Sequence, residues 1–321
     1  MTVNRVDFGD ALSFYDRWAS PTVIISDGAY GIGGFPGDPK QTKALPSWYE
    51  PHVAAWSETA TPGTWLWFWN TEAGWAVMHS LLENYGWKYV ELVVWNKGIQ
   101  HVAGNVNGRT IRQFPVVTEV SGLYMKEALF KGGPGQESLS LQDWLREEWY
   151  RAGLPFSAAN QVCGVKNAAT RKWLTADHHW YMPPYEAYRK LADYANMHGN
   201  QDSAPFFHTR TGLFNEKEWN NLRGVWNHTH GLTNVWDVPS LRSVERVKSL
   251  KGKPLHANQK PLLLMERQIA ATTNLGDVVW EPFGGLCSGS VAAKKLGRDS
   301  YAAEMNPEYH LLASQRVANL P

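Results

Sequence analysis

The chain has 321 residues, 43% of them hydrophobic, and a formal net charge of +1. This length allows one large α/β domain with an inserted subdomain, or two ordinary domains. The two cysteines, Cys163 and Cys287, exclude a disulfide framework and a cysteine-rich zinc site, and we expect no metal. The N-terminus lacks a secretion signal and no apolar run could span a bilayer, so we expect a cytoplasmic protein with no membrane partner.

The charge is unevenly distributed. Residues 131–255 contain 16 Lys and Arg against 12 Asp and Glu, which leaves about −3 for the rest of the chain. Such an asymmetry is a weak indication that the middle segment meets phosphate. The 17 tryptophans are expected mainly in the core, although some could offer flat surfaces for stacking a base.

The first segment alternates strands and helices. A β-branched run at 21–26 ends at a Gly-rich loop, as a buried parallel strand does. A second apolar run covers 65–69, a helical pattern covers 73–85, and a third strand is expected at 91–95. Strand, helix and strand at this spacing form a βαβ unit, which predicts an α/β fold with a parallel sheet.

The middle segment becomes helical from 138 to about 198. Within it, 157–165 and 166–174 resemble two short helices joined by a glycine turn, as in a helix-turn-helix. The alternative is a plain αα-hairpin that packs as a lid. If the segment reads DNA, the side chains that do so are at the start of the second helix: Lys166, Asn167, Thr170 and Arg171.

The strand-helix pattern returns at the end of the chain. We expect a helix at 262–273, a strand at 277–280, a Gly-rich turn at 281–290, a helix at 291–296 and a strand at 300–303. Glu304 ends that last strand. Glycines allow a ligand close to the backbone, and a carboxylate at the end of the next strand can accept both hydroxyls of a ribose. The glycine spacing does not fit G-x-G-x-x-G, so NAD is disfavoured, and a plain packing turn is the alternative.

A second motif, Ser26-Asp27-Gly28-Ala29-Tyr30, lies at the end of the first buried strand. An acid and an aromatic residue three positions apart can hold a planar group, because the carboxylate accepts from an amine while the ring stacks on the face. In isolation, an Asx-type turn with a packing tyrosine is the favoured interpretation.

Together the two motifs resemble the amino-methyltransferase family of DNA enzymes, whose catalytic loop reads Asp/Asn/Ser-Pro-Pro-Tyr. Asp27 and Tyr30 match that loop, and 281–285 resembles the family's Asp-Pro-Phe-x-Gly cofactor turn. Further matches follow in order along the chain: 8–11, 95–97, 235–239, 256–261, 304–309 and Arg316. With the catalytic loop first and the cofactor turn last, this is the motif order of the β group.

The resemblance implies a Rossmann-like, mostly parallel methyltransferase sheet. Its catalytic half would be 1–130, its cofactor-binding half 234–321, and a helical target-recognition insert would occupy 131–233. S-adenosylmethionine would be the cofactor. The catalytic residues would be Asp27, Gly28 and Tyr30, and the cofactor-binding residues Asp10, Asp27, Lys260, Glu281, Phe283, Gly284, Gly285, Glu304 and Asn306.

The implied reaction is methylation of a flipped-out base in double-stranded DNA. Asp27 in the first loop position favours adenine N6, and cytosine N4 is the alternative. A non-catalytic DNA-binding relative, or a methylase of RNA or of protein glutamine, are further alternatives. The implied setting is the cytoplasm of a bacterium, an archaeon or a phage-infected cell, with a homodimer and a cognate restriction endonuclease as partners.

The sequence departs from the family pattern at two places. Gly28 and Ala29 replace the two loop prolines, and Leu286-Cys287 stands where Ser-Gly is usual. The first departure bears on the rigidity of the catalytic loop and the second on cofactor affinity.

Overall fold

The computed structural model describes residues 2–102, 107–131, 138–200, 204–209, 211–241, 245–248, 255 and 258–319. The chain forms two compact units: Met1–Lys126 with Gly224–Pro321, and Glu127–Arg223. The unit boundaries, 126/127 and 223/224, fall four and ten residues before those expected from sequence, 130/131 and 233/234. Lys126 ends a strand of the first unit, and Asn227 donates to the carbonyls of Ala270 and Thr273 in the same unit.

One eight-stranded sheet organises the first unit, in the order β1-β8-β7-β2-β3-β5-β4-β6. All pairings are parallel except those of β5 with β3 and with β4. The mostly parallel α/β sheet expected from sequence is confirmed. The strands are β1 (Asn4–Phe8), β2 (Val23–Ser26), β3 (Trp65–Asn70), β4 (Trp87–Asn96), β5 (Thr118–Lys126), β6 (Val235–Asp237), β7 (Val278–Glu281) and β8 (Asp299–Glu304).

The sequence did not predict β1, β5 or β6. The expected neighbours β3 and β4 are parallel to each other, but β5 lies between them and pairs antiparallel with both. Its residues include Gly122, whose missing side chain makes room for the indole of Trp75: an added Cβ would lie 2.7 Å from Trp75 Nε1. In the β3–helix–β4 unit, the two strands are therefore not neighbours, because β5, which comes later in the chain, lies between them.

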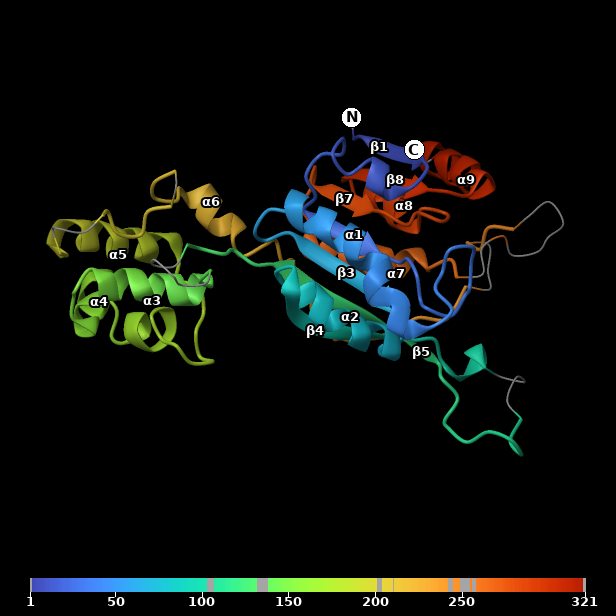
Figure 1. The fold of residues 1–321 in the computed structure, drawn as a ribbon, viewed down its shortest axis with the longest axis horizontal. Coiled ribbons are helices and arrows are strands. Elements are labelled where there is room, and N and C mark those ends of the chain that lie inside the picture. The colour runs from blue at the N-terminus through green and yellow to red at the C-terminus, as the bar shows by residue number, and fades with distance from the viewer. Residues whose placement is uncertain are drawn as a thin grey trace. The chain divides into compact units, whose positions relative to one another are not determined.

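Helices cover both faces of this sheet (Figure 1). Alternate residues of the buried strands face opposite layers: Ile24 and Leu66 pack with α1 (Leu45–Thr59) and α2 (Glu72–Asn84), whereas Val23 and Trp67 pack with α7 (Leu262–Thr272) and α8 (Ser288–Lys295). The C-terminal α9 (Pro307–Ala318) packs against β1 and α8. Short helical turns are η1 (Ala11–Ser13), η2 (Thr42–Ala44) and η3 (Ile99–His101). Thirteen of the 17 tryptophans are buried, as expected for core residues.

The strand directions bring distant parts of the sequence to one edge of the sheet. Parallel strands end at the same edge, so the segments after β2, β4, β7 and β8 meet there. Because β5 runs the opposite way, it begins at that edge, and Glu119 near its start joins them.

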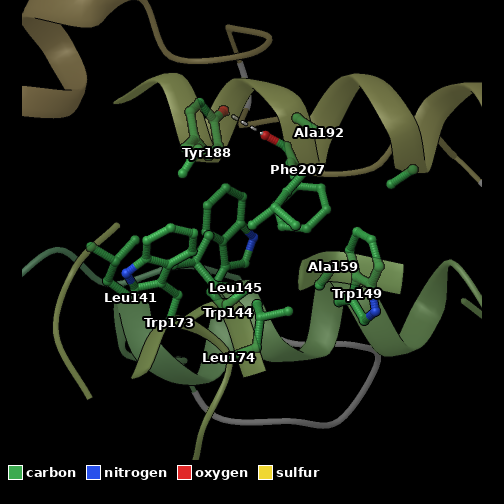
Figure 2. Packing of buried hydrophobic residues seen from close by; sticks show 14 of the residues in the cluster. Leu141, Trp144, Leu145, Trp149, Ala159, Trp173, Leu174, Tyr188, Ala192 and Phe207 are labelled. Atoms are coloured by element: carbon green, nitrogen blue, oxygen red, sulfur yellow. Dashed lines mark hydrogen bonds between the residues drawn. The ribbon is translucent and has the colours of Figure 1, made fainter. Parts of the chain in front are cut away.

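The second unit is helical, with its own aromatic core. It contains α3 (Leu141–Arg151), α4 (Phe156–Cys163), the π-helical turn η4 (Ala169–Trp173), α5 (Tyr185–His198) and α6 (Glu216–Asn221). Figure 2 shows Trp144 and Leu145 of α3 among Phe207 and residues of α5, with the Tyr188 hydroxyl donating to the Phe207 carbonyl over 3.1 Å. Tyr188 also stacks on Trp219 of α6 at 4.0 Å between ring centroids.

The two short helices expected at 157–165 and 166–174 take a different form. The first is α4, which ends as expected at a glycine, Gly164, in a left-handed conformation. The second is only the five-residue η4, so Lys166 and Asn167 lie in the turn before it rather than in a helix. The side chain of Asn160 accepts from the Thr170 backbone amide and donates to the Thr170 hydroxyl, which holds this turn on α4.

Shortening Leu145 should destabilise the second unit, because this side chain is fully buried. We expect Leu145→Ala to lower the free energy of unfolding by about 2–5 kcal/mol, measured by urea denaturation. The control Leu145→Met conserves volume and should cost less than about 1.5 kcal/mol. Equal losses in the two variants would contradict the close packing described.

Candidate active site

A buried ion pair joins the loop after β2 to the segment before α7. Lys260 Nζ lies 2.7 Å from Asp27 Oδ1 and 3.0 Å from the Tyr30 hydroxyl, which itself donates to Asp27 Oδ1 over 2.9 Å. Only 3% of the Lys260 side chain is exposed. Three residues predicted for the site thus contact one another although 230 residues separate two of them.

Glu119 extends this cluster, and the sequence did not single it out. Its Oε2 lies 3.2 Å from Lys260 Nζ and 3.3 Å from the Tyr30 hydroxyl, while its Oε1 pairs with Lys97. We call Asp27, Tyr30, Lys97, Glu119 and Lys260 the sheet-edge network. The available signal was the acid at the start of an apolar β-rich run, which is too common to stand out.

The charges of this network stabilise one another. Burial alone would raise the pKa of Glu119, but Lys260 and Lys97 outweigh it and lower the pKa. Burial acts to lower the pKa of Lys260, whereas Asp27 and Glu119 raise it. Burial, with the carboxylates of Asp27 and Glu119, raises the pKa of Tyr30 well above its usual value. Lys260 is therefore a cation, Glu119 an anion and Tyr30 a neutral hydrogen-bond donor.

A second carboxylate fixes the loop from Asp27 onward. Asp38 Oδ1 accepts from the amides of Tyr30 and Gly31, and Oδ2 from those of Ile32 and Gly34, at 2.8–3.3 Å. Asp38 is 8% exposed. Hydrogen bonds to a buried carboxylate are among the stronger ones, so this clamp supplies order to a loop that lacks prolines.

The two residues in place of the prolines are closely packed. A Cβ on Gly28 would lie 2.6 Å from the Phe283 ring and 2.8 Å from the Tyr49 hydroxyl, so only glycine fits. The carbonyl of Ala29 accepts from the Tyr49 hydroxyl at 3.0 Å and from the Asn70 amide at 2.9 Å. The loop after β2 thus packs directly on the turn after β7.

Within that turn, Glu281 binds the chain itself. Its carboxylate accepts from the amides of Gly289 and Ser290, both at 2.7 Å, and from the Ser290 hydroxyl at 2.8 Å. Burial raises its pKa to about 7 despite these bonds. The structure therefore places Glu281 at the N-terminus of α8, where it fixes the turn.

The unusual Leu286-Cys287 pair combines a left-handed backbone with a buried side chain. Cys287 has a φ of +51°, a left-handed conformation that glycine adopts freely and that other residues rarely do. Its side chain is fully buried with Val291 and Ala302, and the Leu286 carbonyl accepts from Arg316 at 2.8 Å. The buried packing of the Cys287 thiol offsets part of the cost of this backbone conformation.

Glu304 and the residues after it border the same turn. Glu304 accepts from the Gly285 amide and the Asn306 amide, both at 2.7 Å, and burial raises its pKa. Asn306 caps α9 by accepting from two amides, and Asp10 caps η1 by accepting from Leu12 at 3.0 Å. Asn306 and Asp10 are thus bound to helix starts at the sheet edge.

The predicted cofactor turn packs closely on its own neighbours at Gly284. At Gly284 a Cβ would meet Cys287 Sγ at 2.8 Å and the Ala303 carbonyl at 3.0 Å, so the turn accepts no side chain there. Phe283 packs among Trp48, Tyr49 and His52. A glycine turn between two strand ends, with the Glu304 carboxylate beside it, fits a nucleoside-bearing cofactor.

The predicted DNA-reading residues lie in the second unit. Lys166 and Asn167 are exposed just before η4, and Arg171 and Lys172 are exposed within it. Thr170 differs, because its hydroxyl bonds Asn160 and the Asn167 carbonyl and so stabilises the turn.

The described part of the chain contains no group of three or more His, Cys, Asp or Glu side chains that could hold a metal ion. Its helices are all too short or too polar to cross a bilayer.

Comparison with known families shows which family the chain belongs to. The profile of the N6/N4 methyltransferase family, described as DNA methylase, matches residues 22–315. The chain belongs to this DNA methylase family. The resemblance noted in the sequence is confirmed at the level of family and fold.

Curated relatives match over shorter stretches. The chain is 40% identical over 75 residues to the type II methyltransferase M1.MboII of Moraxella bovis, which covers 23% of this chain and 29% of that protein. It is 34% identical over 92 residues to the DNA adenine methyltransferase YhdJ of Escherichia coli K12, covering 29% and 30%. The matches span less than a third of these relatives.

Solved structures share the fold over almost the whole chain. A complex of M1.HpyAVI with S-adenosylmethionine has a TM-score of 0.50 at 18% identity, covering 98% of this chain and 99% of that one. The cytosine-N4-specific PvuII DNA methyltransferase has a TM-score of 0.55 at 13% identity, covering 100% and 89%. The α/β methyltransferase fold of this family member is therefore shown.

The raised pKa of Glu281 predicts a pH dependence of stability. The folded state holds this proton up to about pH 7, whereas an ordinary Glu loses it near 4.5, so the unfolding free energy falls as pH rises between these values. We expect Glu281→Gln to remove up to about 2 kcal/mol of that fall between about pH 5.5 and 7.5 in urea denaturation.

The matched control is Glu308→Gln, which changes an exposed carboxylate in the first turn of α9. It should keep the pH slope of the parent. An unchanged slope in Glu281→Gln would show that Glu281 is ionised across this range.

Proposed function

We propose that this chain transfers a methyl group from S-adenosylmethionine to the exocyclic amine of a base in DNA. The single observation that supports it most is the family match combined with the contact of Asp27, Tyr30 and Lys260 at the carboxyl edge of the sheet. The site joins two distant parts of the chain: the loop after β2, with Asp27 and Tyr30, and the segment before α7, with Lys260.

The chemistry explains why a carboxylate is needed. The lone pair of an exocyclic amine is delocalised into the base, so the nitrogen is a poor nucleophile. Asp27 accepts one N–H and the Gly28 carbonyl the other, which directs the lone pair toward the methyl carbon. Tyr30 stacks on the base, which has to leave the duplex to reach this depth.

S-adenosylmethionine, when bound, supplies a methyl group already activated on a sulfonium. The chain's part is to bind and orient it: Gly284 and Gly285 admit it against the backbone, and Glu304 is aimed to accept from ribose hydroxyls. Phe283 and Asp10 border that turn. Glu281 and Asn306 act indirectly, by fixing the helices α8 and α9 on which the turn depends.

We further propose adenine N6 as the target. Asp27 occupies the first loop position, where the cytosine enzymes more often carry serine, and one relative is named a DNA adenine methyltransferase. Cytosine N4 is the second candidate, because the PvuII enzyme of the same fold is cytosine-specific. A non-catalytic DNA-binding relative is disfavoured by the intact Asp27–Tyr30 pair.

Double-stranded DNA is the proposed partner, with the helical unit as its reader. Lys166, Asn167 and Arg171 are exposed together on one turn, a suitable set for phosphate and base edges. A homodimer, a cytoplasmic location and a cognate restriction endonuclease complete the proposal. The last is supported by three relatives that are named type II methyltransferases.

Sequencing DNA from cells that express this protein, with detection of modified bases, tests the reaction and the base together. The parent should leave N6-methyladenine at one short sequence, whereas Asp27→Ala should reduce it at least about 100-fold because the amine loses its acceptor. Cofactor affinity, measured by calorimetry, should change little in this variant. Only N4-methylcytosine would overturn the choice of base, and an active Asp27→Ala would remove Asp27 from the mechanism.

The triple variant of Lys166, Asn167 and Arg171 to Ala should weaken binding to the cognate duplex about 10-fold or more, measured by fluorescence anisotropy at fixed salt. The matched control is Lys217→Ala, which removes an exposed cation from α6 of the same unit. Parent-like affinity in the triple variant would show that these three side chains do not contribute to DNA binding.

A further inference from the structure

We propose that Glu119 is a positioning residue for methyl transfer: it takes over the hydrogen bonds of Lys260 and Tyr30 when the target amine binds to Asp27. This inference rests on the proposed function. It concerns a residue that carries no part of the amine or cofactor contacts described above.

The need for a second acceptor comes from the bonds that Asp27 already makes. Its Oδ1 accepts from both Lys260 at 2.7 Å and the Tyr30 hydroxyl at 2.9 Å. Each donor draws negative charge from the carboxylate, and one of them is a full cation. An Asp27 bound in this way is a weak acceptor for an amine whose lone pair it has to localise.

Glu119 is placed to receive both donors. One atom, Oε2, lies 3.2 Å from Lys260 Nζ and 3.3 Å from the Tyr30 hydroxyl. These distances exceed those to Asp27 by only a few tenths of an ångström, so small movements exchange one acceptor for the other. Lys97 binds Oε1 and so keeps Oε2 directed at the pair.

The exchange conserves charge inside the network. Two lysines and two carboxylates sum to zero whether Lys260 lies closer to Asp27 or to Glu119. No new charge has to be buried, which would be costly at a site where Lys260 is 3% and Glu119 16% exposed. No covalent N–H or O–H bond breaks in this step, so no proton is transferred.

Space for the movement exists beside Glu119. Glu119 and Lys97 line a cavity of about 290 Å³, together with Trp95, Leu241 and Gln259. This open space borders Glu119 on the side of Lys97, and the short distances to Lys260 and Tyr30 mean that the exchange needs only small movements of side chains.

The test is Glu119→Gln, which keeps the shape of the side chain and removes its charge. We expect kcat for methyl transfer to fall at least about 10-fold, with KM for cofactor and for DNA within about threefold of the parent. The control Glu91→Gln removes a half-buried carboxylate from β4, the neighbouring strand, and should keep the parent kcat.

A double variant separates positioning from charge balance. Glu119→Gln with Lys97→Met restores neutrality but not the charged acceptor, so it should stay as slow as the single variant. Recovery of the parent kcat would overturn the inference. If Glu119→Gln does not fold, Glu119→Asp keeps the charge and withdraws the acceptor; a parent-like kcat there would overturn the inference equally.

Binding without cofactor gives a second readout. The parent should bind a duplex with adenine at the methylated position more tightly than one with purine, which lacks the amine, and this ratio should shrink in Glu119→Gln. An unchanged ratio with parent-like kcat refutes the inference alone. A parent that transfers no methyl group to any DNA refutes the proposed function and this inference together.

Discussion

The buried contact between Lys260 and Asp27 is the interaction on which the candidate site depends. It joins a loop near the start of the chain to the segment that leads into α7, and both belong to the same sheet edge. Neither charge is favourable in a dry interior by itself, and losing one partner of such a pair commonly costs about 3–5 kcal/mol. Each part of the first unit therefore needs the other, because Asp27 from one part neutralises the buried charge of Lys260 from the other.

Around that pair the carboxylates divide their tasks by location. Asp27 pairs with Lys260 and Glu119 pairs with Lys97 and Lys260, whereas Glu281 and Asp38 accept mainly from backbone amides. Acids of the first kind balance the buried lysines, at the place where we propose that the amine binds. Acids of the second kind hold loops in place, which explains why a turn with three glycines, Gly284, Gly285 and Gly289, is nevertheless ordered.

Much of this arrangement could be predicted from the sequence. Strands such as β2 and β7 carry continuous apolar runs that stop at glycine-rich loops, and the order of motifs along the chain indicated the family. The order of the strands across the sheet could not be predicted. The strand β5 enters between β3 and β4 from later in the chain, and antiparallel pairing reverses which of its ends meets the site. Glu119 was therefore missed: its importance follows from strand direction, which local pattern does not encode. Glu281 shows a contact that the motif did not predict, because its carboxylate accepts from the amides at the start of α8.

Asp38 has a consequence for what residues 28 and 29 have to supply. This one carboxylate, eleven residues beyond Asp27, accepts from four backbone amides of the same loop. Gly28 is constrained instead by its close neighbour Phe283, and ring stiffness at 28 and 29 plays no part. An acid outside the motif therefore orders the backbone that follows it, so the shape of the loop does not depend on the motif alone.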